Sequence, residues 1–233
     1  MMTALVLAGG TGSRVGTEIP KQYLEVGGKP VMLYCLEELD KNQNIDAIQI
    51  VAEECWHDRI LSWLHRYHMS RKVRGFSLPG ENRQLSIFHG LEDIRKYAVD
   101  TDCVFIHDAA RPFLSQKMID TCVEALLGHD GVLPVLPMKD TVYVSEDGKS
   151  ISSLINRSQV FAGQAPEVFV LGKYYEANRR LLPDRILAIN GSTEPAIMAG
   201  MDIAMIPGDE ENYKITTKAD LERFSEKIKR TEV

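Results

Sequence analysis

The sequence predicts an α/β fold: a mostly parallel sheet with helices on both faces, in three layers, and an inserted β-hairpin. Short apolar runs that fit buried strands alternate with amphipathic segments that fit helices. A glycine-rich loop follows the first apolar run, at the position where such sheets bind their ligands. Residues 141–156 break the alternation, because their two-residue periodicity around Asp147-Gly148 is typical of a hairpin.

The individual elements follow this alternating order along the chain. Buried strands are predicted over 4–8, 47–52, 73–78, 103–106 and 132–136. Helices are predicted from Pro30 onward and over 57–67, 84–97, 117–127 and 218–230. Pro30 suits the start of its helix because its φ is fixed. Pro134 indicates an edge strand or a bulge, because proline lacks the N–H that a sheet ladder uses. The hairpin strands, 141–145 and 151–155, have no obvious place in this sheet.

Composition limits the class of protein. The chain has 233 residues, 44% hydrophobic and 26% charged, which fits one globular domain over 1–233. A net charge of −6 argues against a surface that coats nucleic acid. No apolar run is long enough to cross a bilayer, and the N-terminus lacks a signal-peptide pattern. The four cysteines lack metal-ligand spacing and are expected to be core thiols. We therefore expect a cytoplasmic protein with no membrane or nucleic-acid partner.

The loop after the first strand is the most informative segment. Glycines at 9, 10, 12 and 16 allow its backbone to turn tightly, so that its N–H groups can bind an anion. Arg14 and Lys21 add two cations. The loop lacks the Gly-Lys-Ser/Thr of a Walker A motif, and no acidic residue follows at the spacing of a dinucleotide site. It is interpreted as a phosphate-binding loop, and the alternative is a glycine-rich turn without a ligand.

Several motifs occur along the chain in an order known from one group of enzymes. They are Leu-Ala-Gly-Gly-x-Gly-x-Arg-x-Gly at 7–16, Pro20-Lys21-Gln22, Gly80-x-x-Arg83-x-x-Ser86, His107-Asp108-Ala109-Ala110-Arg111-Pro112, Asp140-Thr141, Asn156-Arg157 and Asn212-x-Lys214-Ile215-Thr216. This set resembles the sugar- and polyol-phosphate nucleotidyltransferases. Among these it is similar to the cytidylyltransferases that make 4-diphosphocytidyl-2-C-methylerythritol, whose sister group makes CDP-ribitol. The resemblance spans nearly the whole chain and implies a Rossmann-like nucleotidyltransferase sandwich.

The resemblance implies a reaction in which a phosphate of the acceptor attacks the α-phosphorus of CTP and pyrophosphate leaves. The attacking oxygen is already an anion, so the reaction needs positioned cations and a metal rather than a general base. The predicted catalytic cations are Arg14, Lys21 and Lys214. Taken alone, each would be an ordinary surface charge.

A magnesium site is predicted at Asp108, which follows the strand 103–106. Mg²⁺ binds oxygen ligands, usually one or two carboxylates together with substrate phosphates. The alternative is a strand-end aspartate that caps the next turn. Glu211 is a candidate second ligand by resemblance. His107 is expected to point to the opposite face, because strand side chains alternate.

The nucleotide is assigned by resemblance to the glycine-rich loop and to the motif at 80–86. The predicted nucleotide-binding residues are Ala8, Gly9, Gly10, Gly12, Gly80 and Ser86. Backbone N–H and hydroxyl groups in a small pocket can select a pyrimidine by its edge. Without the resemblance, Gly80 and Ser86 would be a turn glycine and a helix serine.

The hairpin at 141–156 is, by resemblance, an arm that embraces a second subunit, which implies a homodimer. Thr141 and Arg157 flank the arm and are predicted to contact the polyol phosphate in the neighbouring subunit's site. The planar fork of arginine suits phosphate. The alternative is a decorated surface loop held by an arginine–carboxylate pair.

The chain departs from the resembling enzymes at the acceptor end. Gln164-Ala165-Pro166-Glu167 stands where Gln-Thr-Pro-Gln is usual, and Thr193-Glu194-Pro195-Ala196 replaces a run of the Thr-Asp-Glu/Ala type. We favour 2-C-methyl-D-erythritol 4-phosphate, an isoprenoid precursor, as the acceptor. D-Ribitol 5-phosphate or another phosphorylated acceptor is the alternative. Two other classes stay open: a non-catalytic nucleotide-binding protein, and an NAD(P)-dependent oxidoreductase, against which the missing acidic residue argues.

Overall fold

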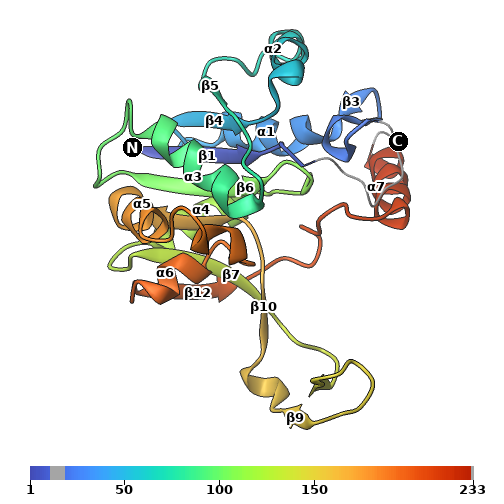
Figure 1. Cartoon of the computed structure of the whole chain (residues 1–233). Helices are drawn as coiled ribbons and strands as arrows, with labels where there is room; N and C mark the ends of the chain where they lie inside the picture. The colour runs from blue at the N-terminus through green and yellow to red at the C-terminus, as the bar shows by residue number, and fades with distance from the viewer. Residues whose placement is uncertain (11–18, 232–233) are drawn as a thin grey trace.

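One eight-stranded sheet runs through the centre of the protein (Figure 1), whose computed structural model describes residues 1–10 and 19–231. The strands are β1 (Met2–Leu7), β4 (Ala47–Val51), β5 (Val73–Ser77), β6 (Cys103–Asp108), β7 (Gly131–Pro137), β10 (Phe161–Gly163), β11 (Glu167–Val170) and β12 (Ile203–Pro207). Their order is β12-β7-β11-β6-β1-β4-β5, with β10 also pairing β7. All pairs are parallel except those of β10 and β11, so the predicted mostly parallel sheet is confirmed.

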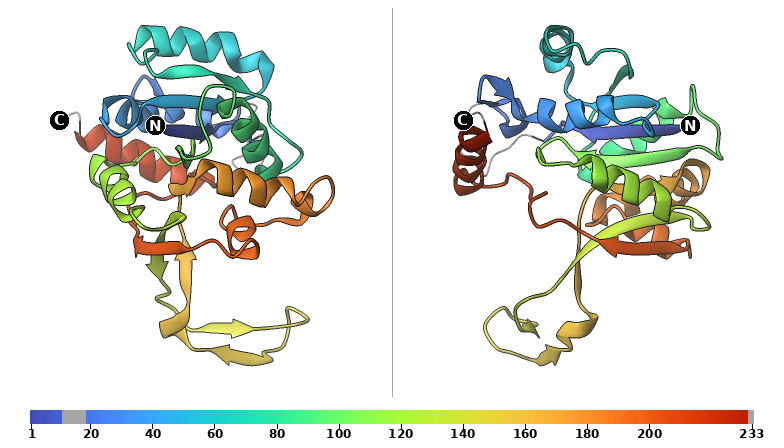
Figure 2. Two further views of the ribbon diagram at one scale, coloured as in Figure 1. Left: turned by 90° about the vertical axis from the view of Figure 1, so that its left-hand side faces the viewer. Right: turned by 180° about the vertical axis from the view of Figure 1, so that it is seen from behind.

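Helices cover both faces of the sheet. They are α1 (Val31–Lys41), α2 (His57–Arg66), α3 (Arg83–Ile94), α4 (Gln116–Ala125), α5 (Leu171–Arg179), α6 (Glu194–Met198) and α7 (Lys218–Thr231). Along β1, Ala4 and Val6 belong to the core shared with α1, α2 and α4, whereas Leu5 belongs to the core shared with α3, α5 and α6. This alternation is expected of a strand buried on both faces. It produces the predicted three layers (Figure 2).

Local sequence signals fix where several helices begin. The side chain of Asn82 accepts a hydrogen bond from Leu85 N at 2.8 Å, so α3 begins at Arg83. Ser115 caps α4 in the same way. The predicted C-terminal helix is also present as α7, where Phe224 is fully buried in a cluster with Val31 and Ile215.

Pro134 does not lie in an edge strand, the first of the two predicted alternatives. The second, an irregularity in the ladder, fits, because the register against β7 shifts between β10 and β11. β7 pairs with β12 on one side and with β10 and β11 on the other. The carbonyl of Pro134 accepts a hydrogen bond from Gln164 N at 2.9 Å, and Gln164 lies in the gap between β10 and β11. The N and C=O of one residue point to the same side of a strand, so the position of the missing N–H faces this gap. The proline therefore lies in an interior strand where the ladder is already interrupted.

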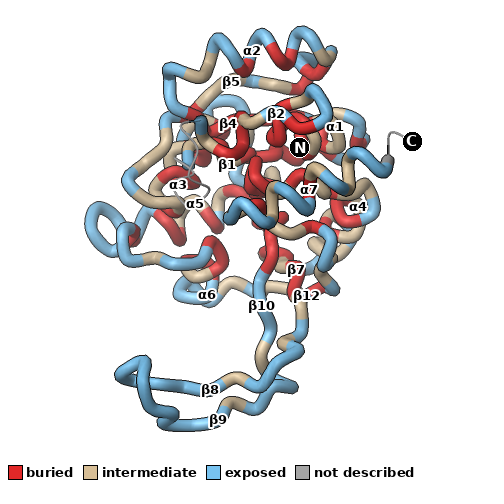
Figure 3. The backbone as a smooth tube through the Cα atoms, turned by 90° about the vertical axis from the view of Figure 1, so that its right-hand side faces the viewer, coloured by how far each residue is buried: buried red, intermediate tan, exposed pale blue. Residues whose placement is uncertain are grey.

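The hairpin expected within 141–156 is formed by β8 (Val142–Val144) and β9 (Ser153–Ile155), which pair antiparallel as a sheet of their own. It projects away from the three layers, and nearly all of it is exposed (Figure 3). Tyr143 and Leu154 are 53% and 64% exposed. An apolar surface of this kind, held away from the core, indicates a contact with another molecule.

Short elements complete the chain. They are the strands β2 (Glu25–Val26) and β3 (Lys29–Pro30) and the 3₁₀ segments η2 (Lys21–Tyr23), η3 (Glu54–Trp56), η4 (Arg157–Gln159) and η5 (Arg185–Ala188). Within the described ranges, no helix has the length and apolar character needed to span a bilayer.

Candidate active site

A cavity of about 410 Å³ lies at the carboxyl ends of β1, β4 and β6, beside the start of α3. Ligands of α/β sheets bind at this edge. Of the predicted site residues, the cavity brings together Gly9, Gly10, Lys21, Gly80, Ser86, Asp108 and Lys214. Arg14 and Gly12 lie outside the described residues.

The entry to the glycine-rich loop is held from two directions. Ala8 N donates to Val51 O at 2.8 Å, and Ala8 O accepts from Gln22 Nε2 at 2.5 Å and from the Tyr23 hydroxyl at 2.8 Å. Gln22 Nε2 also donates to Gly10 O at 2.7 Å. A Cβ at Gly9 would lie 2.6 Å from Pro79 Cβ, so glycine is required there. Ala8, a predicted nucleotide-binding residue, is buried and does not line the cavity.

Lys21 lies beside this loop and is 8% exposed. Its backbone is in the short turn η2, where Tyr23 N donates to Pro20 O at 2.9 Å. The Tyr23 ring stacks on Trp56 at 4.1 Å between ring centroids. The two residues after Lys21 therefore fix the turn and the glycine-rich loop together. Sequence reasoning missed this positioning role of Gln22 and Tyr23, although Gln22 ends the matched motif at 20–22 and Tyr23 follows it directly.

Gly80 and Ser86 face the cavity from the loop before α3 and from its first turns. Gly80 N donates to Ser86 Oγ at 2.9 Å, and Ser86 Oγ donates to Asn82 O at 2.8 Å. A Cβ at Gly80 would lie 2.9 Å from the carbonyl carbon of Leu85, which leaves room for glycine alone. The pair forms one compact wall, as a pocket for a small base requires.

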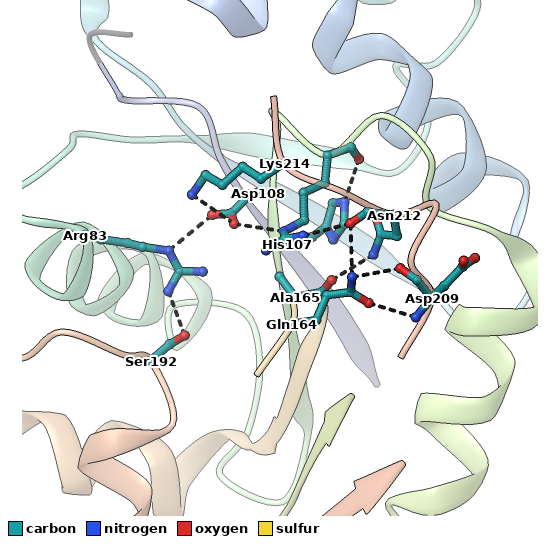
Figure 4. A network of polar contacts seen from close by, with 10 residues as sticks. Arg83, His107, Asp108, Gln164, Ala165, Ser192, Asp209, Asn212 and Lys214 are labelled. Atoms are coloured by element: carbon teal, nitrogen blue, oxygen red, sulfur yellow. Dashed lines mark hydrogen bonds and ion pairs between the residues drawn. The ribbon is translucent and has the colours of Figure 1, made fainter. Parts of the chain in front are cut away.

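Asp108 ends β6 among three cations, two of which, Arg83 and Lys214, are labelled in Figure 4. Its Oδ1 is 3.1 Å from Arg83 Nε, and its Oδ2 is 3.1 Å from Lys214 Nζ and 3.4 Å from Arg111 Nε. Burial alone would raise the pKa of the Asp108 carboxyl. The charges of Arg83, Lys214 and Arg111 outweigh burial and hold this pKa well below its usual range. The site therefore presents an ionised, oriented carboxylate.

His107 points away from this carboxylate, as predicted. It is fully buried, and its Nε2 lies 3.0 Å from the carbonyl oxygen of Arg111. Burial lowers its pKa to about 4, so the ring is neutral at pH 7. The contact with Arg111 O closes the turn that follows β6.

A polar network fixes the segment that carries Lys214 (Figure 4). Gln164 Nε2 donates to Asp209 O at 2.8 Å, and Asp209 N donates back to Gln164 Oε1 at 3.0 Å. Asn212 Nδ2 donates to Ala165 O at 2.8 Å, and Arg111 Nη1 donates to Asn212 O at 2.7 Å. Lys214 is therefore held over Asp108 by contacts from β6 and from the segment before β11.

Besides Ala8, three predicted site residues are not brought to this cavity within one chain. Glu211 is half exposed and pairs with Arg223 and Lys227 of α7, so the structure does not place it beside Asp108 as a second metal ligand. Thr141 and Arg157 are exposed at the arm, where Arg157 Nη1 donates to Lys139 O at 2.7 Å. Neither lines the cavity.

A glycine-rich segment whose Gly9 and Gly10 line the cavity, a buried lysine and a carboxylate held among cations are suited to bind and activate a nucleoside triphosphate. On this fold they define a nucleotidyltransferase. The family model of IspD, 2-C-methyl-D-erythritol 4-phosphate cytidylyltransferase, matches residues 2–230. The chain belongs to this family.

Individual relatives divide between two acceptors. The ribitol-5-phosphate cytidylyltransferase of Streptococcus agalactiae serotype V is 31% identical over 226 residues, which are 96% of this chain and 93% of the relative. The bifunctional enzyme IspD/IspF of Maricaulis maris is 34% identical over 232 residues, 97% of this chain, but the chain spans 57% of that enzyme. Among solved structures, 4-diphosphocytidyl-2C-methyl-D-erythritol synthase from Anaerococcus prevotii matches with a TM-score of 0.81 and 25% identity, over 98% of this chain and 96% of that one.

Proposed function

We propose that this protein transfers the cytidylyl group of CTP to a polyol phosphate, and we favour 2-C-methyl-D-erythritol 4-phosphate as the acceptor. The observation that carries the proposal is the cavity at the strand ends, where Lys21, Lys214 and Asp108 meet. The family match supports the methylerythritol acceptor. The Streptococcus relative supports D-ribitol 5-phosphate as the alternative.

In the proposed reaction, an acceptor phosphate oxygen forms a bond to the α-phosphorus of CTP. The bond between this phosphorus and the oxygen that bridges to the β-phosphate breaks, and pyrophosphate leaves. No proton has to be removed from the nucleophile. Lys21 stabilises the charge on the triphosphate, and Lys214 holds the two reacting phosphates together against their repulsion. Gly80 and Ser86 bound the space for the base.

We propose Mg²⁺ as the metal of this reaction. Asp108 fits it, because its carboxylate is ionised and faces the cavity. Across residues 1–10 and 19–231, no three or more His, Cys, Asp or Glu side chains gather to hold a metal ion. Asp108 would therefore hold the ion together with the CTP phosphates. When bound, Mg²⁺ would neutralise part of the charge of these phosphates.

We further propose that the arm formed by β8 and β9 reaches a second copy of the chain. Its exposed Tyr143 and Leu154 support a homodimer contact. In that dimer, Thr141 and Arg157 would contact the acceptor phosphate in the partner's cavity. Mixed dimers of Lys21→Ala and Arg157→Ala subunits test this idea, since one of their two sites would keep both residues. Activity no greater than in either parent would exclude a shared site.

A cytoplasmic location is proposed as well.

The function itself is tested by pyrophosphate release from CTP and Mg²⁺, with the two acceptors assayed in parallel. Release with one acceptor supports the reaction class and chooses the branch. Folded protein that binds CTP but reacts with neither acceptor would point to a different acceptor, because Ala165 and Pro195 depart from the usual residues. Protein that does not bind CTP would refute the proposal.

A further inference from the structure

A single guanidinium group connects two walls of the cavity. Arg83, the first residue of α3, donates from Nε to Asp108 Oδ1 at 3.1 Å and from Nη1 to Ser192 Oγ at 2.6 Å. Figure 4 shows Arg83 between these two side chains. It thus bridges the end of β6 and the loop before α6. Two contacts from one planar group fix its orientation as well as its position.

The Ser192 end of this bridge is anchored independently. The Tyr174 hydroxyl donates to Ser192 O at 2.6 Å, and Gln84 Nε2 donates to the Tyr174 hydroxyl at 3.0 Å. Tyr174 is fully buried and Ser192 is 2% exposed. Asn82 also donates to Ile186 O at 3.0 Å, which ties the same segment to the start of α3. Ser192 is therefore a fixed point and not a mobile surface hydroxyl.

A second carboxylate lies beneath the bridge. Glu167, at the start of β11, is 8% exposed, and its Oε2 has no hydrogen-bond partner in the described parts of the chain. The pKa of Glu167 is raised, because burial outweighs the charge of Arg83 and a hydrogen bond with Ser192, which lower it. Arg83 therefore lies near two carboxyl groups, the ionised Asp108 at the cavity and the buried Glu167. This arrangement favours one position of the guanidinium.

We propose that Arg83 is a positioning residue that, held in place by Ser192, fixes the Asp108 carboxylate in the orientation that the reaction uses. The inference rests on the proposed function, because it concerns the carboxylate of that same site. With Oδ1 held by Arg83, the carboxylate cannot turn, and Oδ2 stays directed toward Lys214. The energetic cost of arranging these groups is met when the chain folds and does not recur in each turnover.

A double-mutant cycle tests the bridge. Ser192→Ala removes the anchor of Arg83 together with the hydrogen bond to Glu167, and we expect kcat to fall about tenfold with the KM for CTP within about twofold of wild type. Arg83→Lys keeps the positive charge but loses the planar guanidinium group that makes both contacts. We therefore expect a larger fall in kcat than for Ser192→Ala. Because Ser192 acts through Arg83, the double variant should equal Arg83→Lys. Effects that multiply, or a wild-type kcat for Ser192→Ala, would overturn the proposal. So would a rise in the KM for CTP that exceeds the fall in kcat, since Arg83 would then be a nucleotide contact.

The matched control is Ser115→Ala, which removes the capping hydrogen bond of α4 outside the cavity lining. It should lose comparable stability and keep the wild-type kcat.

A second measurement does not depend on activity. The Nε–H signal of Arg83 in ¹H–¹⁵N spectra, assigned by its loss in Arg83→Lys, should be sharp and slow to exchange in the wild type. Ser192→Ala should shift and broaden it. An inactive wild type with this behaviour would refute the proposed function and leave the bridge standing. A signal that Ser192→Ala does not change would overturn the bridge even in an active enzyme.

Discussion

Replacing Lys21 by alanine should lower kcat/KM far more than it lowers stability. The structure sets the magnitude. Lys21 is 8% exposed, its turn is closed by Tyr23 N on Pro20 O, and Gln22 ties that turn to Gly10 O. Lys21 thus lines the cavity from a turn that is fixed by its neighbours, as expected of a preorganised donor. Loss of one such group costs about 3 kcal/mol in the transition state, or roughly 150-fold in rate.

The assay is steady-state pyrophosphate release with CTP and the preferred acceptor, beside urea unfolding of the same samples. Lys173→Ala is the control, because that lysine pairs with Asp130 on the surface and does not line the cavity. Unfolding midpoints close to wild type are expected for both variants. A loss in kcat/KM below about tenfold for Lys21→Ala, with the fold intact, would refute the assignment of Lys21 to the reacting phosphates.

Other perturbations give separate tests of the structure. Gly80→Ala should cost about 1–3 kcal/mol of unfolding free energy and weaken CTP binding, because the added Cβ meets the Leu85 backbone. Urea unfolding measures the first effect and calorimetric titration of CTP the second. Unchanged values would contradict the packing at Gly80. Phe224→Ala should destabilise by about 3–5 kcal/mol, since Phe224 fills the cluster under α7; a loss below about 1 kcal/mol in urea would argue against that cluster. Burial raises the pKa of Asp220, but hydrogen bonds from Thr216 and Thr217 outweigh it and lower this pKa to about 2. Because the folded pKa lies below the ordinary value of about 3.9, Asp220 stabilises the fold above pH ~4 and loses this effect as the pH falls toward 2. Urea midpoints of wild type and Asp220→Asn should therefore converge in acid, and a constant difference would contradict the capping role.

Local patterns predicted most of the fold, because strands buried on both faces and amphipathic helices leave strong periodic signals. The strand predicted at 47–52 is β4 (Ala47–Val51), and the helix predicted at 57–67 is α2 (His57–Arg66). At Pro134 the sequence left an edge strand or a bulge open, and it could not decide between them for a physical reason. The tolerance of the proline depends on a gap between β10 and β11, which are contributed by a later part of the chain. A window of sequence around Pro134 contains no trace of that gap.

The site was predictable where its residues fall in motifs and not where they meet by folding. Lys21, Gly80 and Asp108 lie in recognisable runs, and the structure brings them to one cavity. The contact between Arg83 and Ser192 joins residues 109 positions apart, and only the packing of α5 on α3 and of α6 on α5 creates it. Glu211 shows the opposite failure. Its place in a motif suggested the cavity, but the charges of α7 hold it on the surface.

The arm is continuous with the sheet at both ends, since β7 leads into it and β10 returns from it as an antiparallel pair. Beyond β10 the chain passes directly through Gln164, which secures the segment of Lys214. If the arm binds a second copy, a single coupling free energy links dimerisation to acceptor binding. Each of the two then strengthens the other by the same factor. An acceptor that touches both copies must then tighten the dimer by the same factor by which dimerisation tightens the acceptor. Dilution would inactivate such a protein sooner without its acceptor than with it.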